Sequence, residues 1–108
     1  MINLQADGSG MYTLQALWTQ SREKLPVTTI ILANRKYQIL LGEYQNVGAN
    51  PGPTAMGMLD LSNPTLDWLK LANGMGVEAA QATSLEQCAD LLAQSCAQDG
   101  PFLIELVI

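Results

Sequence analysis

The chain has 108 residues, of which 48% are apolar and 14% charged, and a net charge of −5 at pH 7. This length predicts one small domain over residues 1–108, and the acidic balance argues against a nucleic-acid partner, which would select a basic face. No apolar run approaches the roughly 20 residues of a membrane span, so we expect no membrane partner. Because charged residues usually make up about a quarter of a chain, we expect this one to bury some surface against other chains or domains.

Two segments in the first third of the chain are expected to be strands, and polar residues follow each of them. Residues 2–6 predict a short buried strand that ends at Asp7-Gly8-Ser9. Ser9 is the expected N-cap of a helix over about residues 10–22, where apolar side chains recur at helical spacing. Residues 27–33 are β-branched and apolar, as in a parallel strand covered on both faces, and they end at Asn34.

The middle of the chain predicts two helices separated by a loop. A helix is expected over residues 37–44, and the stretch 47–53 is expected to be a loop because glycine and proline are dense there. A second helix is expected to begin with Pro64 as its first residue and to end at Gly74 and Gly76.

The last third predicts strand, helix and strand. Residues 77–82 and 102–108 form the strands, and the helix between them begins at Ser84 with the capping-box pattern of Ser84 and Gln87. The expected apolar face of this helix is made by Leu85, Cys88, Ala89, Leu92 and Cys96.

The two cysteines predict free thiols. Cys88 and Cys96 are eight positions apart on one expected helix, so their Cα atoms are roughly 12 Å apart, too far for a disulfide. We interpret them as buried thiols of a cytoplasmic protein. This agrees with the residues after Met1, which lead directly into an expected strand and do not resemble a signal peptide. The chain has no histidine, which makes a zinc site unlikely to form.

The alternation of strands and helices predicts an α/β fold, with a mostly parallel sheet of about four strands and helices on its faces. Ligands of such sheets bind beyond the carboxyl ends of the strands, where Asp7 and Asn34 are expected to lie side by side. A carboxylate and an amide oxygen suit a hard cation such as Mg²⁺. Gly8 lets backbone approach a phosphate, and the helix that follows offers its N–H groups to that anion.

Asp7-Gly8-Ser9 and the later Asn34 resemble the thiamine-diphosphate motif of acetolactate-synthase-like and benzoylformate-decarboxylase-like enzymes. That motif runs Gly-Asp-Gly-Ser, a few tens of residues, then Asn-Asn. Ala6 and Ala33 replace its first Gly and first Asn, and neither change removes a ligand. The resemblance covers nearly the whole chain, through Asp7-Gly8-Ser9-Gly10-Met11-Tyr12, Ala16-Leu17-Trp18, Leu25-Pro26-Val27 and Ile31-Leu32-Ala33-Asn34-Arg35-Lys36-Tyr37.

The resemblance implies a truncated thiamine-diphosphate-binding fold, the C-terminal part of a diphosphate-binding domain. It implies that Mg²⁺ is bound by Asp7, Asn34 and the main-chain carbonyl of Lys36. It also implies that thiamine diphosphate is held by the segments that contain Asp7, Gly8, Ser9, Asn34 and Tyr37.

The resemblance also implies that catalysis needs more than this chain. In the family a glutamate from a separate pyrimidine-binding domain activates the cofactor, and no acid here matches it, so we expect no catalytic residue. The chain is then an excised piece, a truncated gene product or one part of a split enzyme that acts on a 2-oxo acid. In acetolactate synthases a Gln-Trp-Gln-type segment follows the Asn motif. Leu41–Asn46 stands in its place here, which argues against acetolactate formation.

Three functions therefore remain open. The first is the thiamine-diphosphate and Mg²⁺ portion of a 2-oxo-acid lyase or carboligase, inactive as an isolated chain. The second is a non-catalytic module that keeps only the fold and assembles through its exposed, truncated edge. For the chain in general, a truncated sheet leaves strand edges unpaired, so we expect a homo-oligomer, at least a dimer. The third is an unrelated Mg²⁺–phosphate α/β protein that uses Asp7 as nucleophile or ligand.

Overall fold

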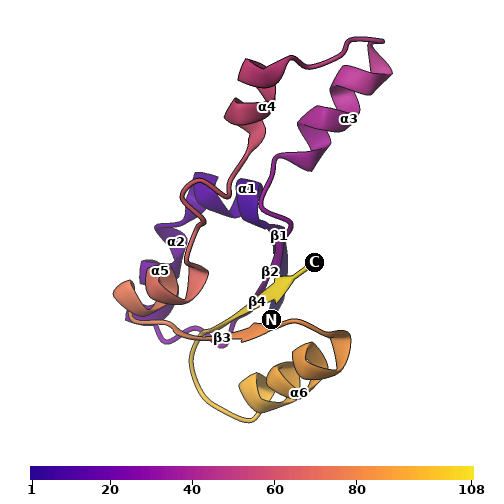
Figure 1. Ribbon diagram of the computed structural model, residues 1–108. Helices are drawn as coiled ribbons and strands as arrows, with labels where there is room; N and C mark the ends of the chain where they lie inside the picture. The colour runs from indigo at the N-terminus through magenta and orange to yellow at the C-terminus, as the bar shows by residue number, and fades with distance from the viewer.

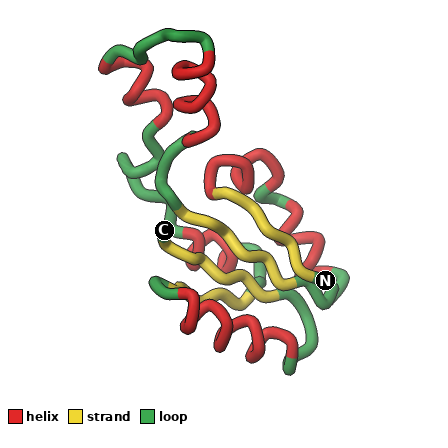
Figure 2. The backbone as a smooth tube through the Cα atoms, turned by 90° about the vertical axis from the view of Figure 1, so that its right-hand side faces the viewer, coloured by secondary structure: helices red, strands yellow, loops and turns green.

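The computed structural model describes residues 1–108 and contains one four-stranded parallel sheet in the order β1-β2-β4-β3. The strands are β1 (Ile2–Ala6), β2 (Thr28–Ala33), β3 (Glu78–Ala82) and β4 (Phe102–Val107), and every neighbouring pair is parallel. All four lie within the predicted ranges, so the predicted α/β fold is confirmed (Figure 2). The expectation that residues 2–6 are buried is wrong, because β1 is an edge strand and its Ile2 and Leu4 are exposed.

Helices cover both faces of the sheet and create two apolar layers (Figure 1). On one face Ile31 and Leu103 pack against Leu17, Trp68 and Ala72 of the helices α2 (Ala16–Arg22) and α5 (Trp68–Gly74). On the other face the sheet packs against α6 (Leu85–Cys96) through a second cluster. Its buried members are Ile30, Ala82, Cys88, Phe102, Ile104 and Leu106.

The first helix begins earlier than predicted. The chain enters α1 (Asp7–Gly10) directly from β1, continues through a 3₁₀ turn at Met11–Thr13, and then forms α2. Ser9 is therefore inside the helix, and the expectation that it is the N-cap is wrong. The physical reason is that Asp7 bonds the N–H of Gly8 at the helix start, while the Ser9 hydroxyl donates backwards to the carbonyl of Ala6 at 3.2 Å.

An arm of two helices, α3 (Gln38–Asn46) and α4 (Pro53–Leu59), stands away from the sheet in both views (Figures 1 and 2). The two helices pack mainly on each other, and the molecule is consequently elongated, 47 × 28 × 22 Å. Helix α4 was not expected from the sequence, because Gly57 and the nearby prolines disfavour a helix interior. Pro53 takes the first helical position, where a missing N–H costs nothing.

Helix α5 begins four residues later than predicted, at Trp68. The expectation that Pro64 is the first helical residue is wrong: Pro64 follows a cis peptide bond in a turn that Ser62 and Thr65 close by a β-bridge. The N-cap is Asp67, whose side chain accepts the N–H of Lys70 at 3.0 Å. A carboxylate at this position stabilises the helix start more than a proline alone.

Helix α6 confirms the predicted cap and corrects the predicted face. The Ser84 hydroxyl accepts the N–H of Gln87 at 3.2 Å. However, Leu85, Ala89 and Cys96 are exposed, so these three do not form the apolar face and Cys96 is not a buried thiol. Ser95 takes the inner position instead, where its hydroxyl pairs with that of Thr28 at 2.9 Å across to the sheet. None of the helices is both long and apolar enough to span a bilayer.

Candidate functional site

The candidate site lies beyond the carboxyl ends of β1 and β2. Because these strands are adjacent and parallel, the turn after β1 and the turn after β2 leave the sheet side by side. Asp7 joins the two turns: its Oδ1 accepts the N–H of Gly8 at 2.9 Å, and its Oδ2 accepts the N–H of Arg35 at 2.6 Å. The carboxylate is only 2% exposed.

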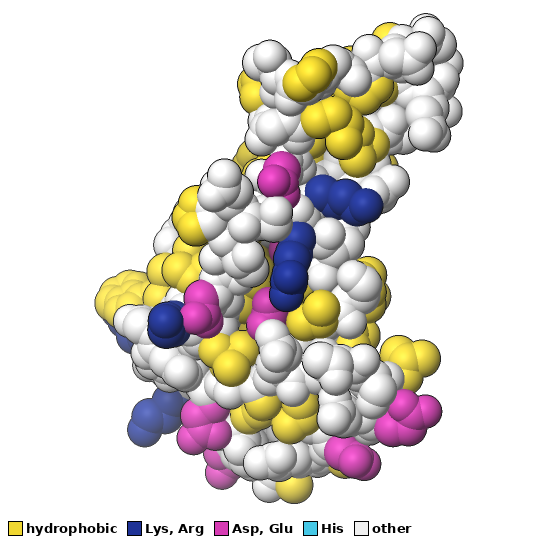
Figure 3. All heavy atoms as spheres, in the orientation of Figure 1, with side chains coloured by type: hydrophobic (Ala, Val, Ile, Leu, Met, Phe, Trp, Pro, Cys, Tyr) yellow, Lys and Arg dark blue, Asp and Glu magenta, His cyan; other side chains and the backbone are white.

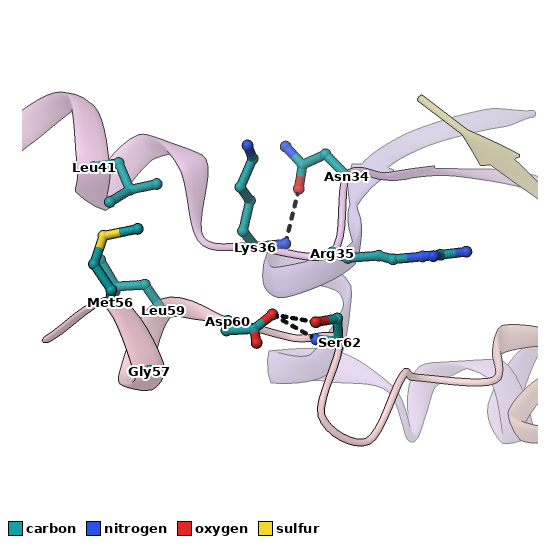
Figure 4. A pocket seen from close by; sticks show the side chains of 9 residues that line it. All are labelled: Asn34, Arg35, Lys36, Leu41, Met56, Gly57, Leu59, Asp60 and Ser62. Atoms are coloured by element: carbon teal, nitrogen blue, oxygen red, sulfur yellow. Dashed lines mark hydrogen bonds between the residues drawn. The ribbon is translucent and has the colours of Figure 1, made fainter. Parts of the chain in front are cut away.

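The turn after β2 places Asn34 and Lys36 on one side. Arg35 has a φ of 60°, a left-handed conformation that reverses the chain between them. The Oδ1 of Asn34 accepts the N–H of Lys36 at 3.2 Å (Figure 4). Figure 4 also shows the Asn34 side chain extending toward Lys36, whereas Arg35 extends away from both.

A short antiparallel bridge fixes the main chain of Lys36 against Asp60. The hydrogen bonds of this bridge come from the flanking residues: Tyr37 donates to the carbonyl of Leu59, and the carbonyl of Arg35 accepts from Leu61. In an extended chain, the N–H and C=O of the residue between two such bonds point to the other side. The Lys36 carbonyl therefore points away from the Asp60 segment, to the side on which its N–H meets Asn34.

Five of the six predicted site residues line one cavity of about 180 Å³: Gly8, Ser9, Asn34, Lys36 and Tyr37. Asp7 does not line it, because it is buried behind the turn. The ring of Tyr37 lies against Gly8 so closely that a Cβ at Gly8 would sit 2.6 Å from two ring carbons. A larger residue at this position would therefore require the Tyr37 ring to shift, whether or not a ligand is bound.

A second, larger cavity of about 440 Å³ lies between the Asn34–Lys36 segment and the arm (Figure 4). Leu41 and Met56 of the arm face each other across it, and Asp60 and Ser62 line its other end. Sequence reasoning missed Asp60 and Ser62 because it assigned them to a helix start. The signal that could have found them is the Asp-x-Ser turn pattern, in which the aspartate bonds the residue two positions later.

The electrostatics of this region combine a fixed carboxylate with neighbouring cations. The Ser62 hydroxyl and then the Ser62 N–H donate to Asp60, which lowers the pKa of that carboxyl below its usual range. Arg35 and Lys36 are exposed beside it. Figure 3 shows Lys and Arg side chains where the arm meets the sheet, in a protein of net charge −5. Two cations, Arg35 and Lys36, therefore lie beside one ionised carboxylate at the base of the arm.

The groups present fit a hard cation held together with an anion. Asp7 is a buried carboxylate whose contacts are backbone N–H groups, and the two ion pairs of the molecule, Arg22–Glu23 and Lys70–Asp67, lie elsewhere. Each carboxylate oxygen keeps a free lone pair, and a buried charge without a counter-ion is costly. The residues that would hold such a cation offer only oxygen donors, namely the Asp7 carboxylate, the Asn34 amide oxygen and the Lys36 carbonyl, and oxygen donors suit Mg²⁺ better than a softer metal.

A parallel sheet with glycine-containing and amide-containing turns at one carboxyl end defines a cofactor-binding α/β domain. Residues 1–106 match the family model described as the C-terminal TPP binding domain of thiamine pyrophosphate enzymes. The chain belongs to this family, which confirms the resemblance deduced from the Asp7 and Asn34 motifs and excludes an unrelated Mg²⁺–phosphate protein.

The similar proteins agree with this assignment. The chain is 50% identical over 107 residues to the Mycobacterium tuberculosis protein IlvX, provisionally named an acetolactate synthase large subunit. This alignment covers 97% of this chain and 21% of that protein. It is 36% identical over 106 residues to a benzoylformate decarboxylase of Pseudomonas aeruginosa, with 98% and 19% covered.

Among solved structures, the thiamine diphosphate-dependent 4-hydroxybenzoylformate decarboxylase of Rhodococcus jostii superposes with a TM-score of 0.86 at 34% identity. The match covers 97% of this chain and 19% of that one. The chain thus spans about a fifth of the length of the curated relatives it matches.

Proposed function

We propose that this chain supplies the diphosphate and Mg²⁺ half of the thiamine-diphosphate site of a 2-oxo-acid lyase or carboligase. The observation that carries the proposal is the Asp7–Arg35 bond, which holds the two turns of the motif together beside a cavity lined by Gly8, Ser9 and Asn34. Family membership supports thiamine diphosphate as the cofactor.

In this proposal Asp7, Asn34 and the Lys36 carbonyl bind Mg²⁺. The support is the all-oxygen character of these donors and the orientation of the Lys36 main chain toward Asn34. Gly8 and Ser9 meet the diphosphate, and Tyr37 closes the cavity against Gly8. The Lys36 side chain adds positive charge at this cavity, where it offsets part of the charge of the anion.

Bound thiamine diphosphate supplies the carbanion chemistry of such enzymes, and the protein supplies binding and orientation. We propose that this chain has no catalytic residue and that a pyrimidine-binding domain supplies the activating group. The 2-oxo acid of the complete enzyme is open, since the named relatives include an acetolactate synthase and benzoylformate decarboxylases. We propose a cytoplasmic location, which agrees with the free cysteines Cys88 and Cys96.

Calorimetric titration with thiamine diphosphate at millimolar concentration, with Mg²⁺ or with a chelator, tests the binding. We expect Mg²⁺-dependent binding that Asn34→Ala abolishes, because the amide oxygen is lost. Asn73→Ala is the matched control: it removes the same group from an exposed position on α5 and leaves binding unchanged. Binding that is indifferent to Mg²⁺, or that survives in Asn34→Ala, contradicts the proposed metal set.

A decarboxylation assay with pyruvate and benzoylformate tests the proposed inactivity of the isolated chain. We expect no turnover with thiamine diphosphate and Mg²⁺ in excess, because loss of orientation at the reacting centre costs several kcal/mol of barrier. Turnover that persists through purification and disappears in Asp7→Ala would show that the chain is a complete enzyme.

Association with a second copy is the other proposal that a specific observation supports. Ile2 and Leu4 are 57% and 61% exposed on the edge strand β1. Leu4 lies in register with Ile30, on the face that α6 covers over the rest of the sheet. An open strand edge with an apolar face favours pairing, so we propose a homo-oligomer, at least a dimer.

A further inference from the structure

Three buried polar atoms without a hydrogen-bond partner in the protein belong to residues that line one small, partly open cavity. They are Oε1 of Gln20, Oγ1 of Thr29 and Nε1 of Trp68. Thr29 is 3% exposed and Trp68 is 1% exposed. These are the only such side-chain atoms in the molecule, and each comes from a different element: α2, β2 and α5.

The cavity lies between the sheet and the helices α2 and α5, apart from the two cavities at the carboxyl ends of the strands. Its volume is about 40 Å³. Since about 10–15 Å³ of such space holds one water molecule, the cavity has room for more than one. Asn3 and Gln5 of β1 also line it, with the Gln5 amide donating to Asn3 at 3.2 Å.

The chemistry of the three atoms selects the occupant. The indole N–H of Trp68 only donates, the amide oxygen of Gln20 only accepts, and the hydroxyl of Thr29 does both. A cation cannot accept from the indole, and an anion cannot donate to the amide oxygen. An apolar guest would leave all three atoms unsatisfied, which is unfavourable for buried polar groups. The occupant is therefore neutral, small, and both a donor and an acceptor.

We propose that this cavity is a water site, in which a bound water accepts from Trp68, donates to Gln20 and bonds the hydroxyl of Thr29. Three hydrogen bonds are the usual number for a buried water. The water connects α2, β2 and α5 beside α1, the helix that carries the Asp7-Gly8-Ser9 motif. Gly10 of that helix touches the same indole, since a Cβ at Gly10 would lie 2.9 Å from Cη2 of Trp68.

The direct test is a water–protein NOE measurement on the full chain labelled with ¹⁵N-tryptophan. The chain has two tryptophans, and Trp18→Phe removes the exposed one, which leaves the indole signal of Trp68 alone. We expect a cross-peak between the Trp68 Nε1 proton and a long-lived water. The cross-peak must persist in Thr29→Val, where no hydroxyl proton can relay it. Absence of the cross-peak, or its loss with the hydroxyl, overturns the proposal.

Thermal unfolding of Thr29→Val is an independent test, because the change in Tm has opposite signs for a water-filled and a dry cavity. Thr29→Val keeps the side-chain shape, and if water is bound we expect its Tm to fall by about 4–8 °C, because the water loses one partner. In a dry cavity the same change removes an unsatisfied hydroxyl, so Tm stays equal or rises. Thr19→Val, an exposed position on α2, is the matched control with no expected change. An equal or higher Tm for Thr29→Val overturns the proposal.

Discussion

The carboxylate of Asp7 accepts a hydrogen bond of 2.6 Å from the backbone N–H of Arg35, 28 residues later in the chain. This bond connects the turn after β1 to the turn after β2, and the same side chain also accepts the N–H of Gly8. Asp7 consequently has a structural role that is independent of any ligand: it satisfies two backbone donors in a region of low exposure.

Replacement of Asp7 is therefore expected to destabilise the protein without any cofactor. Asp7→Ala leaves two backbone N–H groups without partners, at a cost of about 1–3 kcal/mol, which lowers Tm by about 4–8 °C per kcal/mol. Thermal unfolding followed by circular dichroism measures the shift. Asp99→Ala, at an exposed position, is the control and should stay within about 0.5 kcal/mol of the parent. A Tm for Asp7→Ala equal to that of the control would show that the two bonds contribute nothing.

Gly8 and Tyr37 are expected to be coupled. A Cβ at Gly8 meets the Tyr37 ring at 2.6 Å, so Gly8→Ala displaces the ring and costs about 1–3 kcal/mol. Tyr37→Ala removes the clash. In the double variant the cost of Gly8→Ala should largely disappear. A double-mutant cycle measures this, with urea unfolding of the parent, the two single variants and the double variant. Additive costs would mean that the ring is free to move and that the close approach has no energetic weight.

Gly10 is expected to tolerate no larger side chain, in contrast to Gly42 of α3. A Cβ at Gly10 lies 2.9 Å from Trp68 and 3.3 Å from Ile31, inside the core. Gly10→Ala should therefore destabilise by about 1–3 kcal/mol. Nothing lies within 4 Å of a Cβ at Gly42, where alanine improves helix propensity and should not lower the stability. The pair is compared by Tm, and equal shifts would contradict the close packing at Gly10.

Acid stability is expected to depend on Asp67. The N–H of Lys70 donates to its carboxylate and lowers the pKa of Asp67 below the usual value, and the Lys70 ammonium lies 3.4 Å away. Because the folded-state pKa is the lower one, the stabilisation is present above the unfolded pKa of about 3.9 and is lost as pH falls through the folded pKa.

The measurement is Tm against pH from about 6 to 2, in the parent and in Asp67→Asn. The amide keeps the capping oxygen but cannot titrate, so the variant should lose less Tm than the parent below about pH 4. Asp99→Asn serves as the titration control. If the parent and Asp67→Asn have parallel profiles, the carboxylate does not contribute to acid unfolding.

Self-association is expected to depend on the exposed face of β1. Leu4→Glu places a charge among the apolar side chains of the edge strand and should shift light-scattering mass toward the monomer. Leu85→Glu is the matched control, because this leucine is 75% exposed on α6, away from β1. A parent that is monomeric at high concentration, or equal effects of the two variants, would exclude β1 as the association surface.

The strands were predictable because their signal is local. The β-branched run that ends at Asn34 and the apolar run at the C-terminus need burial on both faces, and alternation with helices leaves few arrangements other than a parallel sheet. The Asp7-Gly8-Ser9 and Asn34 motifs also follow directly from residue type and spacing, and the family that they suggested agrees with the match over residues 1–106.

Only the tertiary structure decided how these residues meet. Arg35 bonds Asp7 through its backbone, and backbone donors have no residue type that a pattern could reveal. The inner face of α6 takes Ser95 in place of Cys96 because Thr28 of a distant strand supplies a partner for the hydroxyl. The starts of α1 and α5 likewise depend on which oxygen reaches the first N–H groups. Local sequence thus determined the elements and the family, whereas long-range hydrogen bonds and close packing decided the caps, the faces and the small cavity beside Trp68.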